Sequence, residues 1–119
     1  MTIAQRYYQM VREVEAVLSR QRLPNTMKGK STITYTKISD GSEALVDATL
    51  EVRDKANTCR VFKLQFKKAD GGNVIFEAFA QGVAPEILQS GPLESFTPQL
   101  IEETIRGFID WAVRVESET

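Results

Sequence analysis

The pattern of apolar and polar positions divides the chain into a helix, a run of strands and a second helix. From Ile3 to Leu18, apolar residues recur at steps of three and four, which is the period of an amphipathic helix and predicts a helix over residues 3–21. Pro24 and Asn25 are expected to end this helix, because proline disfavours helical conformation in the residue before it. A loop is expected to follow.

After this loop the period changes to two, which is the spacing of side chains on one face of a strand. Polar and glycine-containing stretches between the alternating segments, such as Asp40-Gly41 and Asp70-Gly71-Gly72-Asn73, predict turns. Consecutive strands that are joined by short turns form an antiparallel meander. The expected strands cover residues 31–36, 44–53, 61–67 and 74–80.

The segment from Gly82 to Phe96 is expected to be irregular, because Pro85, Gly91 and Pro92 interrupt any regular pattern in it. Its apolar residues nevertheless need a surface to pack on. We therefore expect a loop that is docked against the rest of the domain.

A second helix is expected from Pro98 to about residue 115. Thr97 is suited to the N-cap, and proline is favoured at the first helical position. The apolar residues that follow form one stripe on this helix: Ile101, Ile105, Phe108, Trp111, Ala112 and Val115.

These elements predict a single α+β domain over residues 1–119, with the order α-ββββ-α. The fold is expected to be a four-stranded antiparallel meander sheet with the N- and C-terminal helices packed on one face. A chain of 119 residues, 42% of them hydrophobic, is long enough to form one core. The other face of the sheet would then be open, and alternation places on it Thr32, Thr34, Thr36, Leu45, Asp47, Thr49, Glu51, Val61, Lys63, Gln65, Lys67, Ile75, Glu77 and Phe79.

Composition bears on the location and the class of the protein. Fifteen basic residues nearly balance sixteen acidic ones, so no global field attracts nucleic acid or an anionic membrane. Cys59 is the single cysteine and cannot form an intramolecular disulfide, which favours a reducing compartment such as the cytoplasm or nucleus. No signal peptide and no apolar run long enough to span a bilayer is expected.

Candidate catalytic groups are few. The chain has no histidine, which removes the commonest general base and the commonest metal ligand. Cys59 therefore lacks its usual base, and Asp47 and Glu51 lie about 13 Å apart along one strand, too far for a paired-carboxylate site. Cross-strand pairing with Lys63 and Lys67 is the expected role of these acids. No catalytic residue, cofactor or metal site is expected.

One stretch of the chain is strongly basic: residues 53–68 hold six basic residues and one acidic residue. Basic and aromatic side chains on an open sheet are used by modules that stack single-stranded bases. Binding of RNA or acidic phospholipid through the sheet is therefore one alternative function. The basic patch consists of Arg53, Lys55, Arg60, Lys63, Lys67 and Lys68.

A second candidate surface is apolar and combines the 83–96 loop, the second helix and the open sheet. It favours a non-catalytic protein-protein interaction or adaptor module whose partner is another protein, with a homodimer as one form. A small-molecule-binding or enzymatic domain that uses Tyr35, lysines or carboxylates in a cleft is the remaining alternative. The candidate partner-binding residues are Ile87, Leu88, Leu93, Phe96, Phe79 and Ile75.

Two resemblances agree with a binding function. The first covers most of the chain, through residues 33–36, 60–66, 73–79 and 85–88 and the element order around them, and resembles the RWD-like fold of adaptor and kinetochore-type domains. The second covers residues 64–76, a basic strand followed by a glycine turn and Phe76, and is similar to part of the kinase-associated autoinhibitory domain. Both resemblances imply non-catalytic binding and no cofactor.

Overall fold

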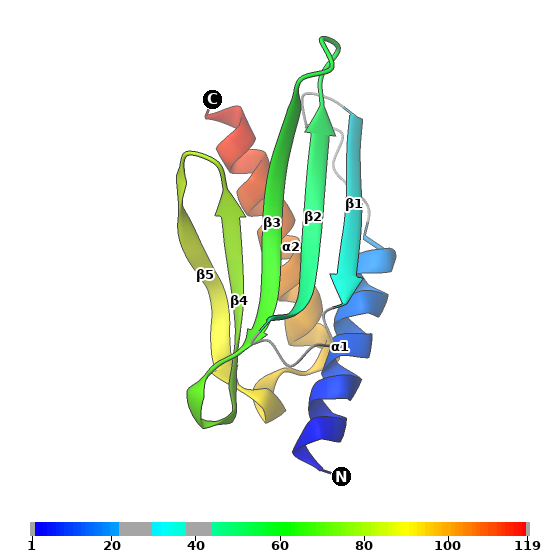
Figure 1. The fold of residues 1–119 in the computed structure, drawn as a ribbon, viewed down its shortest axis with the longest axis vertical. Coiled ribbons are helices and arrows are strands. Elements are labelled where there is room, and N and C mark those ends of the chain that lie inside the picture. The colour runs from blue at the N-terminus through cyan, green and yellow to red at the C-terminus, as the bar shows by residue number, and fades with distance from the viewer. Residues whose placement is uncertain (1, 22–29, 38–43, 119) are drawn as a thin grey trace.

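The computed structural model describes residues 2–21, 30–37 and 44–118. All of its strands pair antiparallel in the order in which they occur along the chain. Both helices lie on the same side of the sheet (Figure 1). The elements are α1 (Ile3–Ser19), β1 (Lys30–Lys37), β2 (Ala44–Arg53), β3 (Cys59–Lys68), β4 (Asn73–Ala80), β5 (Val83–Pro92) and α2 (Pro98–Ser117), with short 3-10 turns at Asp70–Gly72 and Leu93–Ser95.

The α+β class is confirmed, but the sheet has five strands where the sequence predicted four. The segment that was expected to be an irregular loop forms β5 and the second 3-10 turn. β5 pairs with β4 between Asn73↔Pro92 and Ala80↔Val83, with two register shifts along the way. Its prolines are compatible with a strand because β5 lies at the sheet edge, where the outward side needs no hydrogen-bond donor.

α1 begins with a capping box. The hydroxyl of Thr2 accepts a hydrogen bond from the Gln5 N–H at 3.2 Å, and the Gln5 side chain accepts one from the Thr2 N–H at 2.8 Å. The helix ends at Ser19, two residues before the expected end. The expected loop at Pro24-Asn25 and the turn at Asp40-Gly41 lie outside the described residues.

α2 begins as the sequence predicted. Pro98 occupies the first turn, and the hydroxyl of Thr97 accepts a hydrogen bond from the Leu100 N–H at 3.2 Å. The helix continues to Ser117, two residues beyond the expected end. Neither described helix is both long enough and apolar enough to cross a membrane.

The core lies between the two helices and one face of the sheet. The Phe66 and Phe76 rings stack with their centroids 4.9 Å apart, and Phe96 lies 5.6 Å from Phe76. The predicted stripe of α2 is buried throughout. On β2 to β4 the buried residues alternate as predicted: Val46, Ala48, Leu50, Val52, Phe62, Leu64, Phe66, Val74, Phe76 and Ala78.

Candidate protein-binding surface on the open sheet face

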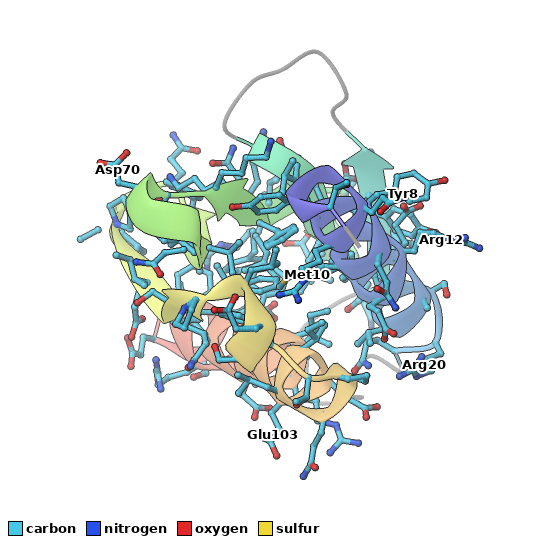
Figure 2. All side chains as sticks on the ribbon, turned by 90° about the horizontal axis from the view of Figure 1, so that it is seen from below. Tyr8, Met10, Arg12, Arg20, Asp70 and Glu103 are labelled. Carbon is cyan, nitrogen blue, oxygen red and sulfur yellow. The ribbon has the colours of Figure 1, made fainter. Side chains whose placement is uncertain are left out.

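In the described part of the chain, no element covers the sheet face opposite the helices (Figure 2), and we call it the open face. Of the fourteen residues expected on this face, none whose burial is described is buried, although Leu45 packs partly against the core beside the irregularity between Ala44 and Val46. Strand register orders the others into rows of opposite residues. One row is Thr34, Thr49, Lys63 and Phe79, and the next is Asp47, Gln65, Glu77 and Ile87.

An apolar cluster lies across β3, β4 and β5 on this face. Ile75 and Phe79 flank Glu77 on β4, and Ile87 of β5 is directly opposite Glu77. Val61 of β3 is the diagonal neighbour of Phe79. Val61 is 40% exposed and Ile87 55% exposed, and the other two apolar side chains are half-buried. We call Val61, Ile75, Phe79 and Ile87 the Phe79 patch.

The orientation of Ile87 is fixed by its neighbour in the chain. Glu86 is opposite Ala78, a core residue, and its carboxylate lies 3.9 Å from the Arg114 guanidinium of α2. Adjacent residues of a strand point to opposite faces. Glu86 therefore faces the helices, and Ile87 faces outward with Phe79.

Two lysines border the Phe79 patch and differ in their partners. Lys67 forms a half-buried ion pair with Glu77, and its ammonium group lies 5.7 Å from the centroid of the Phe79 ring. Lys63 lies directly opposite Phe79, is exposed, and forms no ion pair with a described residue. Among the described residues, the patch thus has one positive charge without an ionic partner beside its central aromatic ring.

The predicted ion pairs between the acids of β2, Asp47 and Glu51, and the lysines of β3 are wrong, because the described charges have other partners. Glu51 lies 3.8 Å from Arg53 of its own strand, and Lys67 pairs with an acid of β4. In Asp47, one carboxylate oxygen, Oδ1, is buried and has no hydrogen-bond partner among the described side chains. Lys67 and Glu77 are diagonal neighbours on the adjacent strands β3 and β4, which places their charged groups within reach of each other.

The six residues of the predicted basic patch do not share one surface. Arg60 and Lys68 occupy positions of β3 that face the helices, and the Lys68 ammonium lies 4.8 Å from the ring of Tyr7 on α1. Lys55 lies in the turn between β2 and β3. Of the predicted basic patch, only Arg53, Lys63 and Lys67 lie on the open face.

The six predicted partner-binding residues divide into two groups. Leu93 and Phe96 are 7% and 8% exposed and belong to the core, so they offer no surface to a partner. Leu88 is half-buried and also packs against the core. The structure brings the remaining three together on the open face: Ile75, Phe79 and Ile87. Val61 completes this cluster and was not among the candidates, because only the strand register reveals that it neighbours Phe79.

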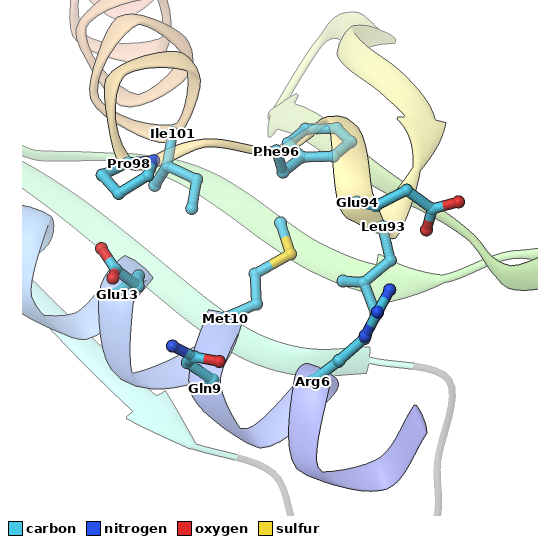
Figure 3. A pocket seen from close by; sticks show the side chains of 9 residues that line it. All are labelled: Arg6, Gln9, Met10, Glu13, Leu93, Glu94, Phe96, Pro98 and Ile101. Carbon is cyan, nitrogen blue, oxygen red and sulfur yellow. The ribbon is translucent and has the colours of Figure 1, made fainter. Parts of the chain in front are cut away.

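A groove of about 330 Å³ lies between α1 and the 3-10 turn before α2 (Figure 3). Met10, Phe96 and Ile101 line its floor, and each is at most 8% exposed. Arg6 and Glu94 lie at its rim. The groove therefore offers little apolar surface of its own.

Two further candidates for chemistry can be placed. The Cys59 thiol is half-buried, and its sulfur lies 3.9 Å from the carbonyl oxygen of Arg60. In the described part of the chain, no three Cys, Asp or Glu residues are grouped so as to hold a metal ion.

Comparisons of the chain with family models, with curated proteins and with solved structures found no match. The resemblances to RWD-like and kinase-associated domains therefore stay predictions.

Proposed function

We propose that this chain is a non-catalytic protein-interaction module that binds its partner through the Phe79 patch. The observation that supports this proposal is the position of the patch: its four apolar side chains lie on three neighbouring strands, β3, β4 and β5, on the sheet face that the helices leave uncovered. Aromatic residues are enriched at protein interfaces, and a few residues near the centre of an interface supply most of the binding free energy. Phe79 is the central residue of such a cluster.

The charges around the patch indicate the chemistry of the partner. Lys63 is exposed beside Phe79 and forms no ion pair with a described residue, whereas Glu77 is already neutralised by Lys67. A partner surface with an apolar centre and a carboxylate at its border would complement this arrangement. The proposed role is that of an adaptor or complex subunit, in the cytoplasm or nucleus that the single cysteine favours.

The other surfaces considered for partner binding receive less support. The apolar stripe of α2 is buried against the sheet, and Leu93 and Phe96 of the 83–96 segment are core residues. Each of them already has an intramolecular role. Of the three predicted surfaces, the open sheet face therefore has the most accessible apolar side chains among the described residues.

RNA or lipid binding also receives less support than protein binding. Arg60 and Lys68 face the helices, and Lys67 is engaged by Glu77, so the open face does not concentrate positive charge. Binding to phosphates would weaken steeply with rising salt, because each contact releases counterions. Salt dependence therefore separates this alternative from an apolar interface.

The proposal is tested by affinity capture with matched variants of the purified chain. Phe79→Glu and Ile87→Lys each place a charge in the patch, whereas Glu103→Lys changes an exposed charge on the outer side of α2, away from the sheet (Figure 2). We expect specific proteins recovered with the wild-type chain to be lost with both patch variants and kept with Glu103→Lys.

Circular dichroism and urea denaturation establish that the variants are folded. Recovery of the same proteins by folded Phe79→Glu and Ile87→Lys chains would contradict the proposal. Recovery of nucleic acid that declines steeply with salt would favour the alternative function instead.

A further inference from the structure

The exposed large hydrophobic side chains of the described residues gather on two surfaces. Val61 and Ile87 belong to the Phe79 patch. Tyr8 and Tyr35 are 55% and 38% exposed and lie on the other flank of the molecule, where α1 contacts β1. Figure 2 shows Tyr8 on the outer side of α1, at the β1 end of the sheet. The open-face proposal does not account for this second pair.

The two edges of the sheet differ in how well they are protected against pairing with another strand. Prolines and β-bulges in an edge strand hinder its pairing with a strand of another molecule. β5 has both, since it contains Pro85 and Pro92 and shows two register shifts against β4. β1 has no proline, and its register with β2 is unbroken from Lys30↔Arg53 to Lys37↔Val46.

β1 therefore presents a regular edge of backbone groups. Every second residue of an edge strand directs its N–H and C=O away from its one neighbour. Among the described strands, β1 pairs only with β2. Eight residues of Thr-rich, β-branched strand without a bulge form a suitable template for a further strand.

We infer that β1 pairs antiparallel with β1 of a second copy of this chain, around a two-fold axis that passes through Thr34. In this register Thr34 faces its own equivalent, and Ile33 faces Tyr35 of the other copy. The symmetry of the dimer repeats the Ile33–Tyr35 contact on both sides of the axis.

Self-complementarity of the strand supports a second copy as the occupant. Residues that are opposite in an antiparallel pair must share a face, so the two residue numbers in a self-pair must sum to an even number. A sum of 68 pairs the aromatic Tyr35 with the β-branched Ile33, a favourable cross-strand combination. A sum of 66 would leave Tyr35 opposite Ser31.

The dimer would be a ten-stranded sheet. A two-fold axis perpendicular to a continuous sheet keeps the helices of both copies on one side, and it places both Phe79 patches on the other. This inference does not rest on the proposed function, because the Phe79 patch lies on β3, β4 and β5, away from the β1 edge.

The oligomeric state tests the inference first. Light scattering after size-exclusion chromatography, over a roughly hundredfold range of concentration, is expected to show a mass twice the 13.4 kDa of one chain at the higher concentrations. A monomeric mass throughout this range overturns the inference. Phe79→Glu is expected to leave the dimer intact, and loss of the dimer in that variant would place the interface on the open face instead.

Cysteine cross-linking tests the register. In a Cys59→Ser background, Thr34→Cys brings two thiols opposite each other, within the Cα separation of about 4.4–6.8 Å that a disulfide requires. Thr32→Cys is the matched control, because it shares the strand and the face but lies four residues from its equivalent. We expect oxidation to cross-link Thr34→Cys and not Thr32→Cys. Equal cross-linking of the two, or none at Thr34→Cys, overturns the proposed pairing.

Discussion

Asp47 is the residue on the open face whose polar groups are least satisfied. Its Oδ1 is buried without a hydrogen-bond partner in the described part of the chain, and a buried polar group without a partner costs about 1–3 kcal/mol. Threonine suits a pleated surface and removes the charge, as at the neighbouring Thr49. We expect Asp47→Thr to raise the free energy of unfolding by about 1 kcal/mol, measured by urea denaturation.

The control for this prediction is an aspartate whose carboxylate is satisfied. Asp54 accepts a hydrogen bond from the Thr58 N–H at 2.9 Å across the β2–β3 turn. Asp54→Ala is expected to lower the free energy of unfolding by about 1 kcal/mol. A loss of stability in both variants would show that Asp47 stabilises the fold, contrary to our account.

At the scale of the elements, the β4–β5 hairpin is the feature that periodicity did not reveal. Ala80 pairs with Val83, which leaves Gln81 and Gly82 as a two-residue turn, but Gln-Gly is not the Asn-Gly or Asp-Gly signature of such turns. Register shifts also break the alternation of β5: Ile87 is opposite Glu77 on the open face, whereas Gln89, two residues later, is opposite the core residue Phe76. The helices and the other four strands were predictable because their periods are regular over most of their length, apart from the irregularity at the start of β2.

This hairpin leads to a test at a single glycine. Gly82 has a φ of 78°, which other residues adopt only with strain. Gly82→Ala should therefore lower the free energy of unfolding by about 1 kcal/mol. Gly107 lies in α2 with open space around the position of a Cβ atom. Thermal denaturation should show Gly107→Ala to be stabilising, and a gain of stability in both variants would contradict the turn geometry.

The segment that joins β5 to α2 gives a second test at this scale. Phe96 is 8% exposed, and its ring lies 5.6 Å from that of Phe76, so Phe96→Ala should cost about 3 kcal/mol of stability. Ile87 is 55% exposed, and Ile87→Ala should change stability by less than about 0.5 kcal/mol. Urea denaturation compares the two. Equal effects would mean that Phe96 is not the core residue described here.

For the whole molecule, the sequence pointed to several residues of the candidate surface, but it did not show which of them lie together. Alternation alone places Ile75 and Phe79 on the open face, but Ile87 joins them only through the pairing of β5 with β4. The sequence alone could not show that Leu93 and Phe96 are core residues and not partner-binding residues, because an apolar residue is expected in either place. The division of the basic residues was predictable, since Arg60 and Lys68 occupy even positions of β3.

The central claim is that the Phe79 patch binds a protein partner. Its most direct test is the dissociation constant of a captured partner, measured by titration calorimetry for the wild-type chain and for folded Phe79→Glu and Glu103→Lys chains. Loss of a central aromatic anchor costs about 2 kcal/mol or more, which is more than tenfold in affinity. We predict that Phe79→Glu weakens binding at least tenfold and that Glu103→Lys leaves it unchanged. Equal dissociation constants for all three chains would contradict the account.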